Sequence, residues 1–249
     1  MRTWKVWAGG LMVCVGTAAT AAPVTVSLQA SKDNTLYEDP NGTLSDGIGP
    51  HLFAGRSNQG SGSIRRGLLA FNLSSIPAGA TVTSATLTLN ASKSNSASTI
   101  ISLHKVTKNW GEGTSNAGDP GGSGAAATTN DATWKHTFFS TQTWTNPGGD
   151  FAGAASATST ITGLGLRTWT GAGMVADVQS WLASPSSNFG WELIGDESQS
   201  ATAFRFDTRE INTASLRPAL SVTYDVVPEP TALGLLALAP LLARRLRRA

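Results

Sequence analysis

The feature that most constrains the fold is the stretch of residues 81–90, in which apolar and hydroxyl-bearing side chains alternate. Val82, Leu87 and Leu89 belong to the apolar set, and Thr86 and Thr88 to the other. A period of two places the two sets on opposite faces of an extended strand. The pattern is typical of a strand with one buried face, and its slip near Ser84 predicts a bulge.

Strand patterns recur along most of the chain. They cover residues 24–28, 64–73, 100–106, 191–194, 203–206 and 219–224. Only residues 174–182 have helical spacing, and Ser184-Pro185 ends that segment. Residues 111–165 are rich in Gly, Ala, Ser and Thr, which predicts long loops. We expect an all-β protein: a single two-sheet β-sandwich of jelly-roll type, with one short helix and long Gly/Thr/Ser-rich loops.

The N-terminus has the layout of a secretory signal peptide. Arg2 and Lys5 precede an uncharged stretch, residues 6–19, and small residues follow it. This stretch is shorter than the ~20 residues that a membrane-spanning helix needs. We therefore predict a signal peptide over residues 1–22, removed by signal peptidase, with a buried N-terminal helix as the alternative. Cys14 is the single cysteine and lies inside this segment, so no disulfide can hold the mature domain.

The C-terminus carries three elements in order: Pro228-Glu229-Pro230, an uncharged stretch at residues 231–243, and the cluster Arg244-Arg245-Leu246-Arg247-Arg248. A helix over the uncharged stretch spans about 20 Å, less than the ~30 Å hydrocarbon core of a bilayer. The arginines would stay on the cytoplasmic side. The tail is thus a temporary membrane stop, with a core helix and a solvated basic end as the alternative.

The formal charge of +2 belongs to these two ends. They hold six of the 18 Lys and Arg residues and one of the 16 acidic residues, which leaves 12 basic against 15 acidic, a net charge of −3. A nucleic-acid partner would require a basic surface. We therefore expect no nucleic-acid binding.

The tail closely resembles the PEP-CTERM sorting signal of Gram-negative bacteria, carried here by Pro228, Glu229, Pro230, Arg244 and Arg245. The resemblance implies that residues 228–249 are recognised and removed by an exosortase in the inner membrane. It implies export through that membrane to the cell envelope, the cell surface or the extracellular polysaccharide matrix. Membrane contact would then be confined to the precursor.

Residues 23–227 resemble the DNRLRE-domain proteins. The resemblance rests on the order of several short segments: Asp33-Asn-Thr-Leu-Tyr-Glu38, Arg65 to Asn90, Asn109-Trp-Gly-Glu-Gly113, Val178-Gln-Ser-Trp181, Phe206-Asp-Thr-Arg-Glu210 and Arg217-Pro-Ala-Leu220. That family consists of jelly-roll modules grouped with carbohydrate-binding modules and common in secreted proteins. It implies a jelly-roll fold and, for some members, carbohydrate binding.

Tryptophans and arginines provide the candidate glycan-binding residues. Trp110, Trp134 and Trp144 lie in loop-like sequence, where an exposed indole could pack on a sugar ring; the alternative for each is packing beneath the loops. Trp181 and Trp191 lie in periodic segments and are expected in the core. Arg205 and Arg209 should share one strand face, either in ion pairs or in a cationic groove for acidic polysaccharides.

Asp33, Glu38 and Asp39 are the candidate ligands for calcium, which prefers oxygen ligands. The alternative is that they form turns. No catalytic residues are predicted, because the sequence lacks a nucleophile motif and a metal-ligand spacing of histidines. We expect a non-catalytic exported protein that binds exopolysaccharide. A structural matrix protein without a specific glycan is the alternative, and a polysaccharide-degrading enzyme is the third reading.

Overall fold

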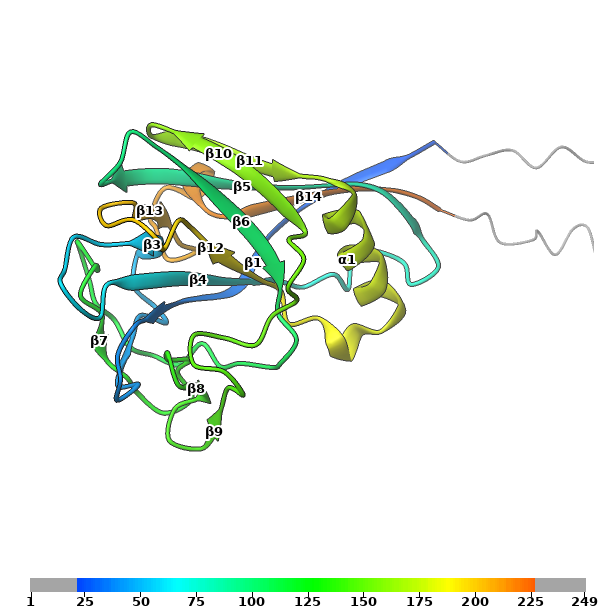
Figure 1. The fold of residues 1–249 in the computed structure, drawn as a ribbon. Coiled ribbons are helices and arrows are strands. Elements are labelled where there is room, and N and C mark those ends of the chain that lie inside the picture. Colours follow the sequence, from blue (N-terminus) through cyan, green and yellow to red (C-terminus); the bar gives the residue numbers. More distant parts are fainter. Residues whose placement is uncertain (1–21, 227–249) are drawn as a thin grey trace, which may run out of the picture. The chain divides into compact units, whose positions relative to one another are not determined.

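The computed structural model describes residues 22–226, and residues 23–226 form one compact unit (Figure 1). The predicted sorting tail and all of the predicted signal peptide before Ala22 lie outside the described residues. The unit is built mainly of antiparallel strands, which confirms the all-β prediction. Its first and last strands pair at Val24 and Tyr224, so both ends leave the unit at the same place.

Ten strands form one continuous sheet, so a jelly-roll sandwich stays a prediction, and we call the two groups of paired strands sheet A and sheet B. Sheet A contains the first part of β1 (Val24–Tyr37), then β14 (Ala219–Asp225), β5 (Thr81–Ser94), β11 (Gly165–Thr170), β13 (Phe204–Asp207) and β3 (His51–Arg56). Sheet B contains the second part of β1, then β4 (Ile64–Phe71), β12 (Trp191–Ile194), β6 (Ser98–Lys105) and β10 (Ala157–Thr162).

Two strands, β1 and β3, pair with strands of both sheets. The pairing of β1 shifts register between Ala30 and Lys32, and beyond this point β1 leaves β14 and pairs with β4. The end of β3 also pairs with β4, through Gly55 and Arg56. A bulge bends its strand, so a strand can pass from one sheet to the next. As a result β1, β14, β5, β13, β3 and β4 close into a ring.

Several local predictions hold in the structure. The bulge predicted near Ser84 is present, because β14 shifts register where Thr223 pairs with Ser84 and Tyr224 with Val82. The predicted helix is α1 (Ala172–Ala183), followed by the 3₁₀ turn η1 (Pro185–Ser187); a second turn, η2 (Ala214–Leu216), precedes β14. No helix within residues 22–226 is long and apolar enough to cross a membrane.

The prediction of loops throughout residues 111–165 is wrong at its end, where β10 forms. Only Ala157 and Ile161 mark its buried face, and the residues between them are small and polar, so the alternation is weak. Three short strands also lie in this region: β7 (Ala125–Ala126), which pairs with β2 (Leu44–Ser45), and β8 (His136–Phe138), which pairs with β9 (Gln142–Thr143). Most of the segment before β10 is irregular, as predicted.

The unit has two hydrophobic cores. The larger lies between the sheets and includes Trp169, Trp181, Trp191 and Phe206, so the two tryptophans expected in the core are there. The smaller lies on the other face of sheet B, beneath the segment 106–151, which we call the covering segment. It is why β4 reads Gly-Leu-Leu-Ala-Phe without alternation: both faces of this strand are buried.

Candidate functional site

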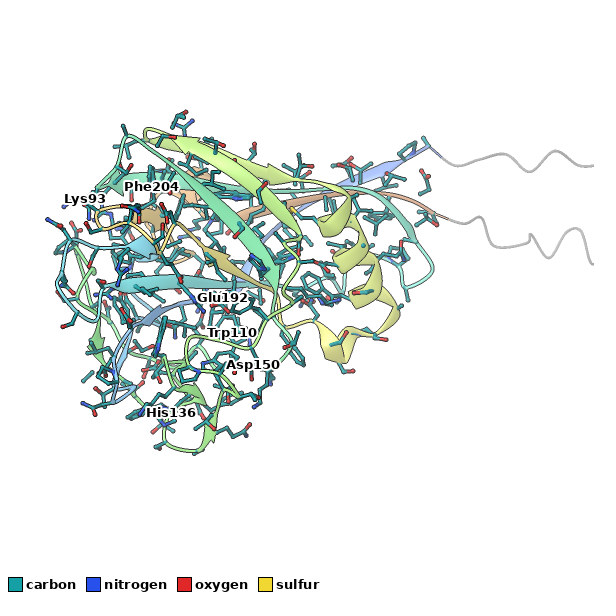
Figure 2. All side chains as sticks on the ribbon, in the orientation of Figure 1. Lys93, Trp110, His136, Asp150, Glu192 and Phe204 are labelled. Atoms are coloured by element: carbon teal, nitrogen blue, oxygen red, sulfur yellow. The ribbon has the colours of Figure 1, made fainter. Side chains whose placement is uncertain are left out.

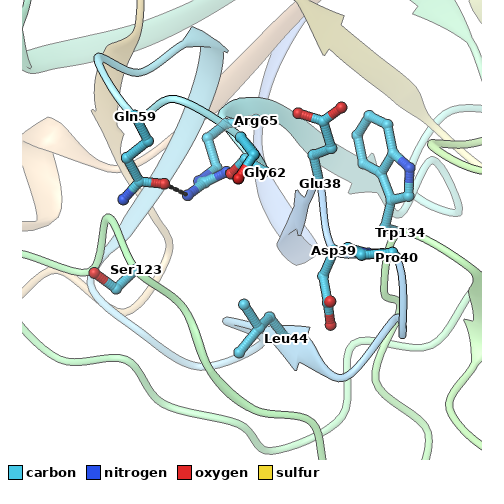
Figure 3. Close-up of a pocket in the computed structure, with 10 residues that line it drawn as sticks. Glu38, Asp39, Pro40, Leu44, Gln59, Gly62, Arg65, Ser123 and Trp134 are labelled. Carbon is cyan, nitrogen blue, oxygen red and sulfur yellow. Dashed lines mark hydrogen bonds between the residues drawn. The ribbon is translucent and has the colours of Figure 1, made fainter.

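The described residues include a groove with two parts, and Figure 3 shows residues of the larger part. Its larger part has a volume of about 650 Å³, and its smaller part about 190 Å³. The two parts adjoin, since Arg65 and Ser123 line both. The combined size is in the range of small-ligand sites. Loops that follow β1 and β3, the segment 120–123, and the ends of β5 and β13 provide its walls.

Trp134 is the one tryptophan in the lining of the larger part, and it is only partly buried. Its ring packs against the Arg66 guanidinium, 5.1 Å from the ring centroid. Glu38 lies beside it in the same wall, and Gln59 lies across the groove, hydrogen-bonded to Arg65 (Figure 3). This part therefore offers one aromatic ring together with carboxylate, amide and hydroxyl groups.

The smaller part is lined by three cations and by no carboxylate: Arg65, Lys93 and Arg205. Arg65 is only 3% exposed, packs over the Tyr37 ring and donates to the carbonyls of Gly62 and Gly122. Neither Arg65 nor Lys93 forms an ion pair within residues 22–226. Excess positive charge in this part favours an anionic ligand.

Arg205 has one acidic partner, Asp119, at 2.7 Å, and the Asp119 side chain is 72% exposed. Lys93 lies directly opposite Arg205 in the pairing of β13 with β5. Like charges at such positions repel each other. The sequence did not predict that Arg205 lies beside Lys93, because no local pattern in β5 or β13 indicates that these two strands pair.

The structure corrects the prediction for Trp110 and Trp144. Trp110 is 1% exposed and Trp144 is 4% exposed, and both pack in the core under the covering segment. Their indole N–H groups donate to the carbonyls of Phe189 and Thr133. Neither indole has a free face, so neither can form a sugar-stacking surface. The covering segment turns back over sheet B and buries them.

Arg209 is also not placed as predicted. β13 ends at Asp207, so the alternation that would set Arg209 beside Arg205 does not reach it. Instead Arg209 forms two hydrogen bonds with Glu112, at 2.9 and 2.6 Å, and a 3.0 Å ion pair with Glu210. Its guanidinium is committed to these carboxylates and takes no part in lining the groove.

The candidate calcium ligands do not come together. Asp33 is fully buried and accepts a hydrogen bond from the Arg209 backbone N–H. Glu38 accepts the backbone N–H groups of Ser63 and Ile64. Asp39 accepts the N–H and hydroxyl of Thr43, so it forms a turn. Among residues 22–226 no group of three or more His, Cys, Asp or Glu side chains is arranged to hold a metal.

Electrostatics separate these acids further. Burial, and then the charge of Glu210, raise the pKa of Asp33 well above its usual value. Burial acts in the same direction on Asp39, but the hydrogen bonds from Thr43 outweigh it and lower the pKa of Asp39. Asp39 thus forms a turn, as in the alternative interpretation, whereas Asp33 lies within β1 and its Oδ1 atom has no hydrogen-bond partner.

No protein-family model matches the chain, and no curated protein matches it. The DNRLRE and PEP-CTERM resemblances remain predictions based on the motifs. Three of the quoted DNRLRE segments do meet in the structure: the Glu112 carboxylate accepts the backbone N–H of Asp33 and pairs with Arg209, and Asn34 donates to the Glu112 carbonyl. Their contacts build the fold beside the groove and do not line it.

Proposed function

We propose that this protein is an exported, non-catalytic polysaccharide-binding protein and that the groove between Trp134 and Arg205 is its binding site. The observation that carries the proposal is the division of the groove into an aromatic, hydroxyl-rich part and a cationic part that share Arg65. A chain of sugar rings has both chemistries to offer, C–H faces and hydroxyls for one part and acidic substituents for the other.

Trp134 supports stacking on a sugar ring. An indole is large, rigid and flat, and its binding to an apolar C–H face loses little conformational entropy. The Arg66 guanidinium fixes the ring from one side. Gln59, Ser61 and Ser123 line the same part and can exchange hydrogen bonds with sugar hydroxyls.

The cationic part supports a preference for acidic polysaccharides. Arginine can hold a carboxylate with two parallel hydrogen bonds. Arg205 can exchange its exposed partner Asp119 for a ligand carboxylate at small cost, because exposed ion pairs contribute only ~0.2–1 kcal/mol. The net charge of −3 outside the two ends is no obstacle, since attraction is exerted locally by Arg65, Lys93 and Arg205.

The remainder of the proposal concerns the fold family and the cellular location of the protein. The two sheets with strands that pair in both are compatible with a DNRLRE-type jelly roll. The signal peptide and the PEP-CTERM tail would bring signal peptidase and an exosortase to the precursor. They would deliver the mature protein to the envelope, surface or exopolysaccharide matrix of a Gram-negative bacterium. We assign no catalytic role, because Glu38 and Asp39, the acids of the groove, serve as acceptors for nearby backbone N–H groups.

The test is binding of residues 23–226, a fragment that contains both cores, to a panel of neutral and acidic polysaccharides. Titration calorimetry or affinity electrophoresis should show binding that Trp134→Ala and Arg205→Ala each weaken at least tenfold. Trp169→Phe, a conservative change in the distant core, is the control for general damage. Failure of every polysaccharide to bind would refute the proposal, and release of reducing ends would instead support the enzyme reading.

One observation favours the alternative of a structural matrix protein. Ile100, Leu164 and Leu166 are 60%, 54% and 55% exposed. Leu164 lies in the turn between β10 and β11, Leu166 lies at the start of β11, and Ile100 lies on β6 opposite Thr160 of β10. Exposed apolar side chains in proximity are typical of an association surface. Sedimentation velocity at rising concentration should then reveal oligomers that Leu166→Lys abolishes. A monomer at all concentrations would rule out this alternative for residues 23–226.

A further inference from the structure

Glu192 is a buried carboxyl group that the proposed binding site does not use directly. It lies on β12, opposite Leu68 on β4 and His104 on β6, and it is 0% exposed (Figure 2). Neither of its carboxylate oxygens has a hydrogen-bond partner. Gly149 is packed directly on it: a Cβ at this glycine would lie 2.2 Å from Glu192 Oε2. The group is therefore enclosed between sheet B and the covering segment.

Charged groups surround Glu192 from four elements. Arg66 on β4 places Nη1 3.6 Å from Glu192 Oε1. Its Nε and Nη2 atoms instead donate hydrogen bonds to the Glu197 carboxylate, at 2.7 and 2.9 Å. Asp150 of the covering segment is held by Lys108 at 3.6 Å. His104 on β6 uses both ring nitrogens, on the Ala152 carbonyl and the Ser102 hydroxyl. Burial raises the pKa of Glu192 to about 8; Arg66 opposes this shift, and Glu197 and Asp150 add to it.

A short path connects Glu192 with the groove. Arg66 Nη1, the atom nearest to Glu192 Oε1, donates a 2.8 Å hydrogen bond to the Gly148 carbonyl. The Gly148 N–H in turn donates to the Trp134 carbonyl at 2.6 Å, and a Cβ at Gly148 would lie 2.9 Å from the Trp134 ring. The same guanidinium packs on that ring. Arg66 thus holds the turn at residues 148–149 and the tryptophan of the groove together.

We propose that Glu192 is a proton-operated latch that controls the Trp134 side of the groove through Arg66. While the carboxyl is protonated, it is a neutral group beneath Gly149, and Nη1 stays on the Gly148 carbonyl. Loss of the proton to solvent leaves a buried carboxylate, which attracts Nη1 from its distance of 3.6 Å and draws it away from the Gly148 carbonyl. The Gly148 carbonyl then loses its partner, and Trp134 loses its support. The Trp134 side of the groove is therefore held in place at pH values below the pKa of Glu192 and loses its support at higher pH.

This inference rests on the proposed function for its biological consequence, but the latch itself can be observed without a ligand. In the free fragment, the fluorescence that depends on Trp134, obtained by subtracting a Trp134→Phe variant, should change with a midpoint near pH 8. Glu192→Gln, a neutral group of the same shape, should remove the change and keep the low-pH spectrum. Glu210 also has a raised pKa but lies away from this path, so Glu210→Gln should leave the fluorescence change in place.

The affinity of the fragment for a polysaccharide should fall at least about fivefold between pH 6.5 and 9.5. A fivefold change is the lower end of the affinity changes that coupling between two sites typically produces. Glu192→Gln should bind equally well at both values. If Glu192→Gln does not fold, Arg66→Lys tests the same path, because a lysine cannot hold Glu197 and Gly148 together, and affinity should then be low at both pH values. A pH change that persists in Glu192→Gln would overturn the latch. Absence of polysaccharide binding with a normal fluorescence change would refute only the proposed function.

Discussion

Replacement of Trp110 by alanine is the sharpest test of the position that the structure gives this residue. The side chain is 1% exposed and packs in the core under the covering segment, with Leu36, Leu68 and Trp144 in the same core. Its indole N–H satisfies the Phe189 carbonyl at 2.8 Å. The substitution leaves a large cavity and removes the partner of a partly buried carbonyl.

The two effects can be given magnitudes. A buried Trp→Ala change costs about 3–5 kcal/mol, and a carbonyl left without its partner costs ~1–3 kcal/mol. Their sum, about 4–8 kcal/mol, is a large fraction of the ~5–15 kcal/mol that stabilises a typical domain. For a domain of this size each kcal/mol moves the melting temperature by ~2–4 °C. We therefore expect the melting temperature to fall by at least about 8 °C.

Urea unfolding followed by far-UV circular dichroism measures this change in the free energy of unfolding. Trp134→Ala is the matched control, because Trp134 is partly exposed at the groove, and its loss should cost less than about 2 kcal/mol while it abolishes stacking. The expected result is that Trp110→Ala lowers stability, whereas Trp134→Ala lowers binding. A Trp110→Ala protein with unchanged stability and impaired binding would refute the burial argument.

Four other outcomes are expected. Arg209→Ala should destabilise the protein by about 2 kcal/mol in urea unfolding, since Glu112 loses its two charged hydrogen bonds with Arg209. Polysaccharide affinity should stay unchanged, and a loss of affinity would contradict the position of Arg209 outside the groove. Arg205→Ala should do the reverse, and a large loss of stability would count against its placement in the groove. Because the pKa of Asp33 is raised in the folded state, its contribution to the free energy of unfolding falls as pH rises from about 4 through the folded-state pKa. The stability of Asp33→Asn relative to the wild type should therefore increase between pH 4.5 and 8. The opposite trend in urea midpoints would show that the pKa shift has the other sign. Addition of a chelator should leave the melting temperature unchanged, and a drop of several degrees would restore the calcium proposal.

The strands and the helix could be predicted because their signals are local. A period of two identified the strand at residues 81–90 and its bulge, and a period of three to four identified α1. Trp181 and Trp191 were assigned to the core for the same reason, since each occupies the apolar face of a periodic segment. β10 was missed because small polar residues leave its alternation faint.

The site depended on contacts between distant segments. Trp110, Trp134 and Trp144 look alike in the sequence, since all three lie in polar, loop-like surroundings. What separates them is how the covering segment folds over sheet B, which buries the first and third and leaves the second at the groove. Arg209 and Glu112 are 97 positions apart, and no local pattern indicates their pairing.

The sequence by itself thus determined the class of the fold, the side chains that share one face of individual strands, and the expectation of export. These depend on periodicity, net charge and the order of elements at the two ends, which are properties of neighbouring residues. Tertiary structure decided which aromatic and charged side chains remain available to a ligand. That depends on which surface each loop covers, and on the pairing that brings Lys93 beside Arg205 and encloses Glu192 beneath Gly149.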